Sequence, residues 1–469
     1  MLRFPLHFSL LPTHGQIFRI TENVFLRLLG FVYLIAFASL WPQLSGLIGG
    51  NGISPAAETL LSMRADYGWH AYLYVPSLFW LWQTDSALHW LCALGCLAAL
   101  MLILGVVVRS AALAAYILYL SLVTIGQPFT SFQWDALLLE TGFLAIFSGA
   151  SLLPLAYRFL LFRFMFESGL VKLTSGDVNW RNLHALRYHF YTQPLPTPLA
   201  YYMQQSPDWL LDALTLATLV IELVAPFLLL ARPRRLRQIA AGLFVLLQVV
   251  IALTGNYAFF NLLTIAICLW ALDDECFPRW LAKWRLPQLP RFPKAANVAC
   301  GAIMTLSLLQ IFALEPPFLE SLEMVNTYGL FAVMTTSRVE LIIEGSNDDV
   351  HWLPYSFPFK PGDVNRSLPL VAPYQPRLDW QMWFAALGQP ESNGWTKTLV
   401  YRLLLGQREV ERLLEPPPFV RPPRSIRILA YGFVFATPAE RHRTGAVWQA
   451  KPLGIWLGPV TLGTRDTKN

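Results

Sequence analysis

Charged side chains are scarce in this chain. Asp, Glu, Lys and Arg together make up 14% of its 469 residues, whereas soluble proteins average about 25%. The hydrophobic fraction is 55% and the mean hydropathy is +0.45. This composition excludes a soluble fold for most of the chain. It predicts a polytopic α-helical membrane protein with room for one extramembrane domain.

Cysteine is also sparse, and the motifs of several enzyme classes are missing. Four of the five cysteines lie within apolar runs and none follows residue 315, so no disulfide framework is expected in the C-terminal part. There is no phosphate-binding glycine loop and no nucleophile elbow. His184 and His189 lie five apart, a poor spacing for two metal ligands on one helix. We therefore predict no metal and no cofactor.

The net charge of +6 would suit a nucleic-acid partner, but the basic residues cluster between apolar runs. The clearest clusters are residues 231–239 (ARPRRLRQI) and 279–294. Short basic loops of this kind remain on the cytoplasmic side of membrane proteins. The clusters therefore predict topology, and no nucleic-acid partner is expected.

Hydropathy predicts about nine membrane segments, of which the first is an uncleaved span. With both basic clusters inside, the N-terminus is cytoplasmic, and residues 174–208 and 317–469 lie on the outer side. The chain is thus expected in a bacterial inner membrane or the endoplasmic-reticulum membrane, with its C-terminal domain periplasmic or luminal. The segments are roughly 24–40, 87–108, 111–126, 132–153, 156–173, 209–231, 238–255, 257–271 and 296–315.

The composition changes after residue 316, which divides the chain into a membrane domain (1–316, including the outer loop 174–208) and an extramembrane domain (317–469). Alternating apolar residues and turn clusters predict a β-rich domain with one helical insertion at residues 397–414. The expected strands are residues 339–344, 352–360, 426–436 and 446–457.

Lys172 is the most informative residue, because it ends an apolar helical run. Ionisable groups inside a membrane are rare, and they usually face a partner or a cavity. The acids Glu167, Asp177 and Glu222 are candidate partners, and Asp135 or Glu140 could also neutralise it. We expect either structural pairing or a lined cavity, with His189 near the ammonium group. The polar residues expected around this pocket are Asp135, Glu140, Asp177, Trp180, Arg181, Tyr188, Gln193, Glu222, Asn256 and Asn261.

Several strings in the chain resemble the lipase maturation factors. The main one runs from SGLVKL (168–173) through the pairs at 176–177, 180–181 and 188–189 to TQPLPTP (192–198). The resemblance implies a membrane-anchored folding factor that assists folding and dimer assembly of secreted lipases. This chain departs from the family where it has Glu167, His184 and Tyr191. The supporting strings are QWDALLLETGFLAIF (133–147), GNYAFFNLLTIAICLWALDD (255–274), NTYGLF (326–331) and YQPRLDWQMWFAA (374–386).

A more distant similarity concerns the vitamin K-dependent gamma-carboxylases, through Gly169, Lys172-Leu173 and Trp180. It implies a membrane enzyme in which Lys172 is a catalytic base for a lipophilic or quinone-like substrate. A desolvated lysine has a lowered pKa and can act as a base, with His189 as a proton relay. Three hypotheses therefore stand: a folding factor for exported lipases, a membrane enzyme with a lipid or quinone-like ligand, and a transporter. The absence of an obvious internal repeat places the transporter last.

Overall fold

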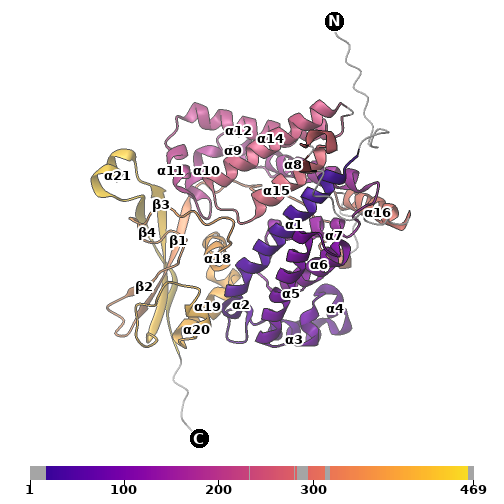
Figure 1. Ribbon diagram of the computed structural model, residues 1–469. Helices are drawn as coiled ribbons and strands as arrows, with labels where there is room; N and C mark the ends of the chain where they lie inside the picture. The colour runs from indigo at the N-terminus through magenta and orange to yellow at the C-terminus, as the bar shows by residue number, and fades with distance from the viewer. Residues whose placement is uncertain (1–16, 232, 279, 282–293, 312–316, 463–469) are drawn as a thin grey trace.

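The structure is a computed structural model that describes residues 17–231, 233–278, 280–281, 294–311 and 317–462. Helices form one large body, and a small β-sheet stands beside it (Figure 1). The first part of the body contains α1 (Arg19–Leu40), α2 (Leu44–Ile48), α3 (Ala56–Tyr67), α4 (Ala71–Tyr74), α5 (Asp85–Leu104), α6 (Val108–Ile125) and α7 (Gln133–Ala145).

Helix α5 packs against both α1 and α6, and glycine lies at its contact with α1. A Cβ atom added at Gly30 of α1 would lie 2.8 Å from the Cβ atom of Leu102 on α5, so only glycine permits this approach. Small residues at such crossings are how membrane helices gain close contact, because lipid supplies no hydrophobic drive between them.

The second part of the body is built around α8 (Leu153–Thr174). Helix α8 packs against α12, α13, α15 and α16. The short helices α9, α10 and α11 connect α8 to α12, and α10 and α11 pack on α12 and α14. Their bounds are α9 (Val178–Arg181), α10 (Leu186–Thr192), α11 (Pro198–Gln204), α12 (Asp208–Leu223), α13 (Ala225–Leu229), α14 (Arg234–Thr254), α15 (Phe260–Cys268), α16 (Lys294–Ile311) and α17 (Pro317–Glu320).

Among the described residues, five helical stretches are long and apolar enough to cross a membrane. Helix α7 has only 13 residues, and α8 carries four charged side chains, so neither qualifies by length and composition. The protein therefore has several candidate spans, and the total of nine remains a prediction. The five stretches are Arg19–Ile48, Asp85–Leu104, Val108–Ile125, Asp208–Leu229 and Arg234–Thr254.

The C-terminal part contains a four-stranded antiparallel sheet in the order β2-β1-β3-β4. Its register places Ile343 of β1 opposite Ile428 of β3, and both side chains are fully buried. The bounds are β1 (Arg338–Ser346), β2 (Leu353–Tyr355), α18 (Arg377–Ala386), α19 (Gly394–Leu404), α20 (Arg408–Glu411), β3 (Ser425–Phe435), α21 (Pro438–Thr444) and β4 (Trp448–Thr461).

Three of the four predicted strands are confirmed, and the predicted helical insertion forms α19 and α20. The strand predicted at residues 352–360 is wrong beyond Tyr355, because only residues 353–355 pair with β1. Prolines at 354, 358 and 361 lack the N–H that a ladder needs, which confines pairing to a short edge strand.

Helix α18 lies between the sheet and α1 (Figure 1) and ties the C-terminal part to the helical body. Arg377 at its start reaches Asp135 of α7 over 242 residues of chain. Arg338 of β1 donates to the carbonyl oxygens of Tyr191, Gln193 and Pro194. The loop 174–208 therefore packs against the C-terminal part.

Candidate functional site

Lys172 and Glu222 form a buried ion pair where α8 meets α12. The Lys172 Nζ atom lies 2.8 Å from Oε2 of Glu222 and donates to Oε1 and to the Ser168 carbonyl oxygen, each at 3.0 Å. Gly169 permits this geometry, because a Cβ atom there would lie 2.9 Å from that of Glu222. The Trp180 ring is 5.3 Å from Nζ and adds a cation–π contact.

The pair borders a cavity of about 110 Å³. Most of its lining is aromatic or aliphatic, so our expectation of a polar pocket is wrong, although an acid and His189 do lie there as predicted. The His189 Nε2 atom is 3.4 Å from the Tyr257 hydroxyl. Burial, reinforced by the positive charge of Lys172, lowers the pKa of His189 to about 4, so the imidazole is neutral at pH 7. The lining includes Phe164, Met165, Trp180, Phe190, Leu247, Ile251 and Phe260.

Asp135 and Glu140 do not reach Lys172, because each has an arginine of its own. Asp135 accepts from Arg377 at 2.9 and 3.0 Å and from the Tyr119 hydroxyl. Arg377 and Asp135 are both fully buried. This pair anchors α18 in the helical body and leaves neither group available for the cavity.

Glu140 forms a second buried network with Arg163 of α8. It also accepts from the Asn326 backbone N–H at 3.0 Å and from the Tyr328 hydroxyl at 2.8 Å. Glu167, a candidate partner of Lys172, instead accepts from the Tyr328 backbone N–H at 3.0 Å. Glu140 and Glu167 therefore fix residues 326–328, which lead into the C-terminal part.

The predicted residues of the loop 174–208 mainly form hydrogen bonds with backbone groups, and few of them line the cavity. Asp177 caps α9 through the Asn179 N–H (2.9 Å) and accepts from the Met334 N–H (2.6 Å), so it is not a partner of Lys172. The Trp180 indole donates to the Phe331 carbonyl at 2.8 Å. Arg181 is exposed and donates to the Leu173 carbonyl at 3.2 Å.

Tyr188 lies within α10, and Gln193 directly follows the last residue of this helix. Tyr188 packs partly buried beside Trp180, outside the cavity lining. Gln193 donates to the Thr254 carbonyl at 2.9 Å and accepts from the Tyr257 hydroxyl at 2.8 Å. Gln193 therefore fixes the ring that closes one side of the cavity.

The two asparagines are structural as well. The Asn256 amide donates to the Leu195 and Pro369 carbonyls and accepts from the Val371 N–H at 2.7 Å. The Asn261 amide donates to Gln248 at 2.8 Å between α15 and α14. Of the ten residues predicted around the pocket, only Trp180 and Glu222 line it.

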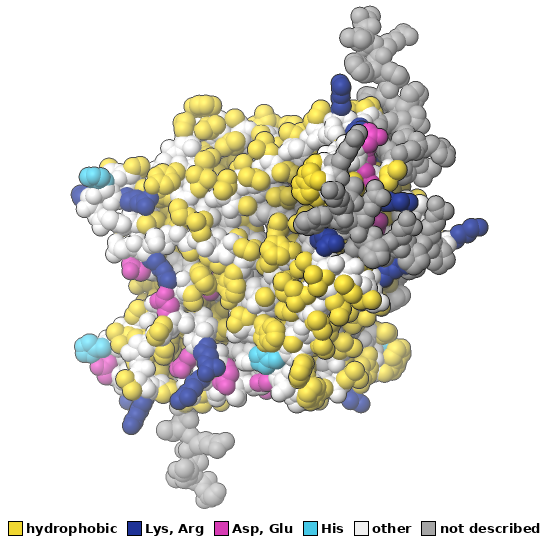
Figure 2. Space-filling view, viewed as in Figure 1, with side chains coloured by type: hydrophobic (Ala, Val, Ile, Leu, Met, Phe, Trp, Pro, Cys, Tyr) yellow, Lys and Arg dark blue, Asp and Glu magenta, His cyan; other side chains and the backbone are white. Residues whose placement is uncertain are grey.

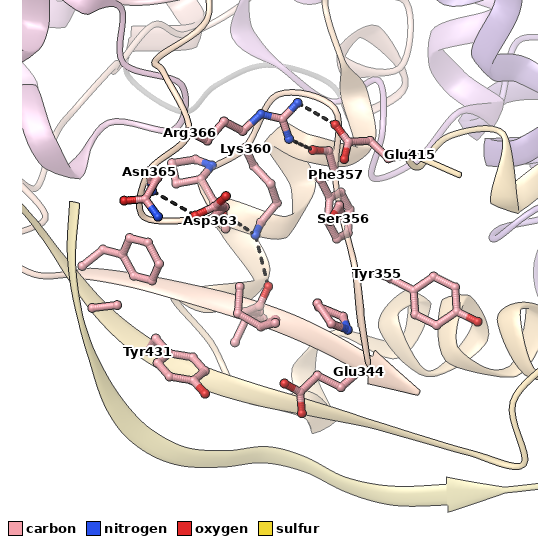
Figure 3. A pocket seen from close by; sticks show the side chains of 17 residues that line it. Glu344, Tyr355, Ser356, Phe357, Lys360, Asp363, Asn365, Arg366, Glu415 and Tyr431 are labelled. Atoms are coloured by element: carbon pink, nitrogen blue, oxygen red, sulfur yellow. Dashed lines mark hydrogen bonds and ion pairs between the residues drawn. The ribbon is translucent and has the colours of Figure 1, made fainter. Parts of the chain in front are cut away.

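A larger hollow of about 560 Å³ lies in the C-terminal part, above β1 and β3 (Figure 3). The Lys360 ammonium points toward the strands and meets Glu340 (2.9 Å), the Pro361 carbonyl (2.9 Å) and the Leu341 carbonyl (3.1 Å). Arg366 and Glu415 pair across the rim at 2.6 Å. Sequence reasoning missed this hollow, because its charged residues come from three distant segments and match no motif. Within the described part of the chain, no group of His, Cys, Asp or Glu could hold a metal ion.

Comparisons with known proteins cover both halves of the chain. The family model for the lipase maturation factor transmembrane domain matches residues 20–279, and that for the lipase maturation factor C-terminal domain matches residues 324–456. Lipase maturation factor 1 of Homo sapiens is 36% identical over 96% of this chain and 89% of its own length. Lipase maturation factor 2 is 32% identical in Homo sapiens (95% of this chain, 83% of the relative) and in Gallus gallus (92% and 80%). No solved structure matches the chain.

Proposed function

This chain belongs to the lipase maturation factor family, and from that premise we propose that it is a membrane-anchored maturation factor for secreted lipases. The observation that carries the proposal is the match of both family domains in one chain, with 36% identity to a named factor over 96% of the chain. The several apolar helices supply the membrane anchor.

We propose further that residues 1–316 form a membrane domain of nine segments, and that residues 317–469 form one extramembrane domain. On this proposal, the domain and the loop 174–208 both lie on the periplasmic or luminal side, where an exported lipase folds. Two features support it: the basic cluster at the start of α14, and the contacts that join Arg338 to residues 191–194 of that loop. The client we propose is an exported lipase that has not yet reached its active form.

Our proposal for Lys172 is a structural role. Its ammonium group lies 2.8 Å from a carboxylate oxygen of Glu222, and it donates hydrogen bonds to Glu222 and to the carbonyl oxygen of Ser168 in the same helix. A catalytic base needs a free lone pair facing a substrate, whereas the Lys172 Nζ atom is directed at Glu222 and at the Ser168 carbonyl oxygen. Neither the family match nor this geometry supports a carboxylase-like reaction, and His189 is then a residue that shapes the cavity.

The proposal is tested in cells from which the resident lipase maturation factor 1 has been deleted. A secreted lipase is expressed in these cells with this chain or with an empty vector. We expect lipase activity in the medium to rise with this chain, and to rise equally with the paired variant Lys172→Met/Glu222→Leu. An unchanged activity, with the chain present in the membrane at the level of the deleted relative, would overturn the proposal.

A further inference from the structure

Two candidate membrane spans, α12 and α14, form the side of the cavity beside Lys172 that we take as its mouth. Thr218 of α12 and Val250 and Ile251 of α14 line the cavity and are all partly accessible from outside. Around this mouth, both helices present exposed apolar side chains, and the space-filling view shows mainly hydrophobic atoms over this part of the molecule (Figure 2). The mouth therefore faces the hydrocarbon of the bilayer. The exposed apolar residues are Leu216, Val220, Leu246, Val249 and Leu253.

The interior carries no net charge. Glu222 neutralises Lys172, and the burial that lowers the pKa of His189 to about 4 leaves that ring neutral at pH 7. An anionic or cationic head group would enter without a partner, which is costly in an apolar enclosure. The chemistry of the lining therefore selects an uncharged, apolar occupant.

A second hollow of about 380 Å³ extends the apolar space toward α18. The two hollows share the side chains of Trp134, Tyr257, Leu330 and Phe331. None of the residues that line the second hollow is Asp, Glu, Lys, Arg or His; they include Phe132, Trp380, Trp383 and Phe384. The two hollows are therefore neighbours, and apolar side chains surround the cavity on the side of α18 as well as on the side of α12 and α14.

We propose that the end of one acyl chain of a bilayer phospholipid enters between α12 and α14 and occupies the cavity beside the Lys172–Glu222 pair. The glycerol and head group stay at the mouth, outside the uncharged interior. Apolar cavities of this size stay empty of water and take apolar guests, and the bilayer supplies such a guest at high local concentration. This inference goes beyond lipase maturation and does not depend on it.

Two neighbouring valines give a matched test. Val249 and Val250 are both 40% exposed on α14, but only Val250 lines the cavity. In Val250→Trp the indole fills the mouth, whereas in Val249→Trp it points into the surrounding lipid. The full-length chain and both variants are purified in detergent, delipidated and mixed with 1-palmitoyl-2-oleoyl phosphatidylcholine, and the retained lipid is counted by native mass spectrometry.

We expect the wild type and Val249→Trp to retain one phosphatidylcholine, and Val250→Trp to retain about tenfold less. Thr218→Phe narrows the same mouth from α12 and should have the same effect, which keeps the test decisive if Val250→Trp does not fold. Equal retention by the wild type and a folded mouth variant would show annular lipid only and overturn the proposal. Absence of retained lipid in the wild type would overturn it as well.

Discussion

Removing Glu222 should destabilise the protein far more than removing Glu222 and Lys172 together. In Glu222→Leu the ammonium group of Lys172 stays in an apolar cavity and keeps only the Ser168 carbonyl as a hydrogen-bond partner and the Trp180 ring as a cation–π contact. In the paired variant Lys172→Met/Glu222→Leu, both charges are replaced by apolar side chains of similar length. The side chains of the native pair are only 4% and 9% exposed, so solvent cannot relieve the stranded charge.

The expected loss of folding stability follows from the free-energy cost of a buried charge without its partner. Breaking a buried pair by removing one partner costs about 3–5 kcal/mol, whereas replacing both partners is often neutral or stabilising. We therefore expect Glu222→Leu to lose about 3–5 kcal/mol of stability, and the paired variant to lie within about 1 kcal/mol of the wild type.

The assay is thermal unfolding of the purified full-length chain in one detergent, followed by tryptophan fluorescence. The expected order of melting temperatures is Glu222→Leu lowest, Lys172→Met next, and the paired variant near the wild type. The exposed pair Arg187–Asp208, with Asp208 68% exposed, is the matched control and should couple by less than about 1 kcal/mol. A paired variant whose loss of stability equals the sum of the two single losses would contradict this expectation, because the two sites would then act independently.

Three further outcomes are expected. Arg377→Met strands the fully buried Asp135 and should lower stability by about 3–5 kcal/mol, measured by the same melting assay; a change below 1 kcal/mol would contradict this. Burial raises the pKa of Asp379 to about 6, so the folded state favours the protonated acid. The stability that the protonated Asp379 adds is fully present below about pH 4 and is lost as the pH rises through 6. The free energy of unfolding falls by about 3 kcal/mol over this range. When the pH is lowered from 7 to 5, the melting temperature of the wild type should therefore rise relative to that of Asp379→Asn. Parallel curves of melting temperature against pH for the two proteins would contradict this. A reporter fused after Arg237 should be cytoplasmic. In an animal cell, the acceptor sequence at Asn365 should carry a glycan that Asn365→Gln removes, and an unglycosylated wild type would place the C-terminal domain on the cytoplasmic side.

Composition and periodicity predict most of the helical body and most of the sheet, because burial in lipid or in a small core leaves a local pattern. They fail at residues 352–360, where aromatic residues suggest a strand but Pro354 and Pro358 lack the N–H donors that pairing needs. They also missed α18, whose ten residues lie in a part of the chain that we expected to be exposed to water on the outer side. Its docking on the body depends on Arg377, and no local pattern reveals a partner 242 residues away.

The candidate site shows the same limit. Energetics alone required a partner for Lys172, and the sequence supplied five candidate acids. Helix packing makes Glu222 the partner, because Gly169 lets α12 approach α8 closely. Asp135 and Glu140 instead pair with Arg377 and Arg163. The apolar character of the cavity was beyond prediction, since its lining comes from helices that hydropathy treats as separate spans.

Lipase maturation by this chain is tested most directly by the specific activity of lipase that is still inside the cell. A maturation factor changes how many lipase molecules are correctly folded, whereas a trafficking factor changes only how many leave. In cells that lack lipase maturation factor 1, expression of this chain should raise the specific activity of lipase recovered from intracellular membranes. A rise in secreted lipase protein at unchanged intracellular specific activity would contradict the account.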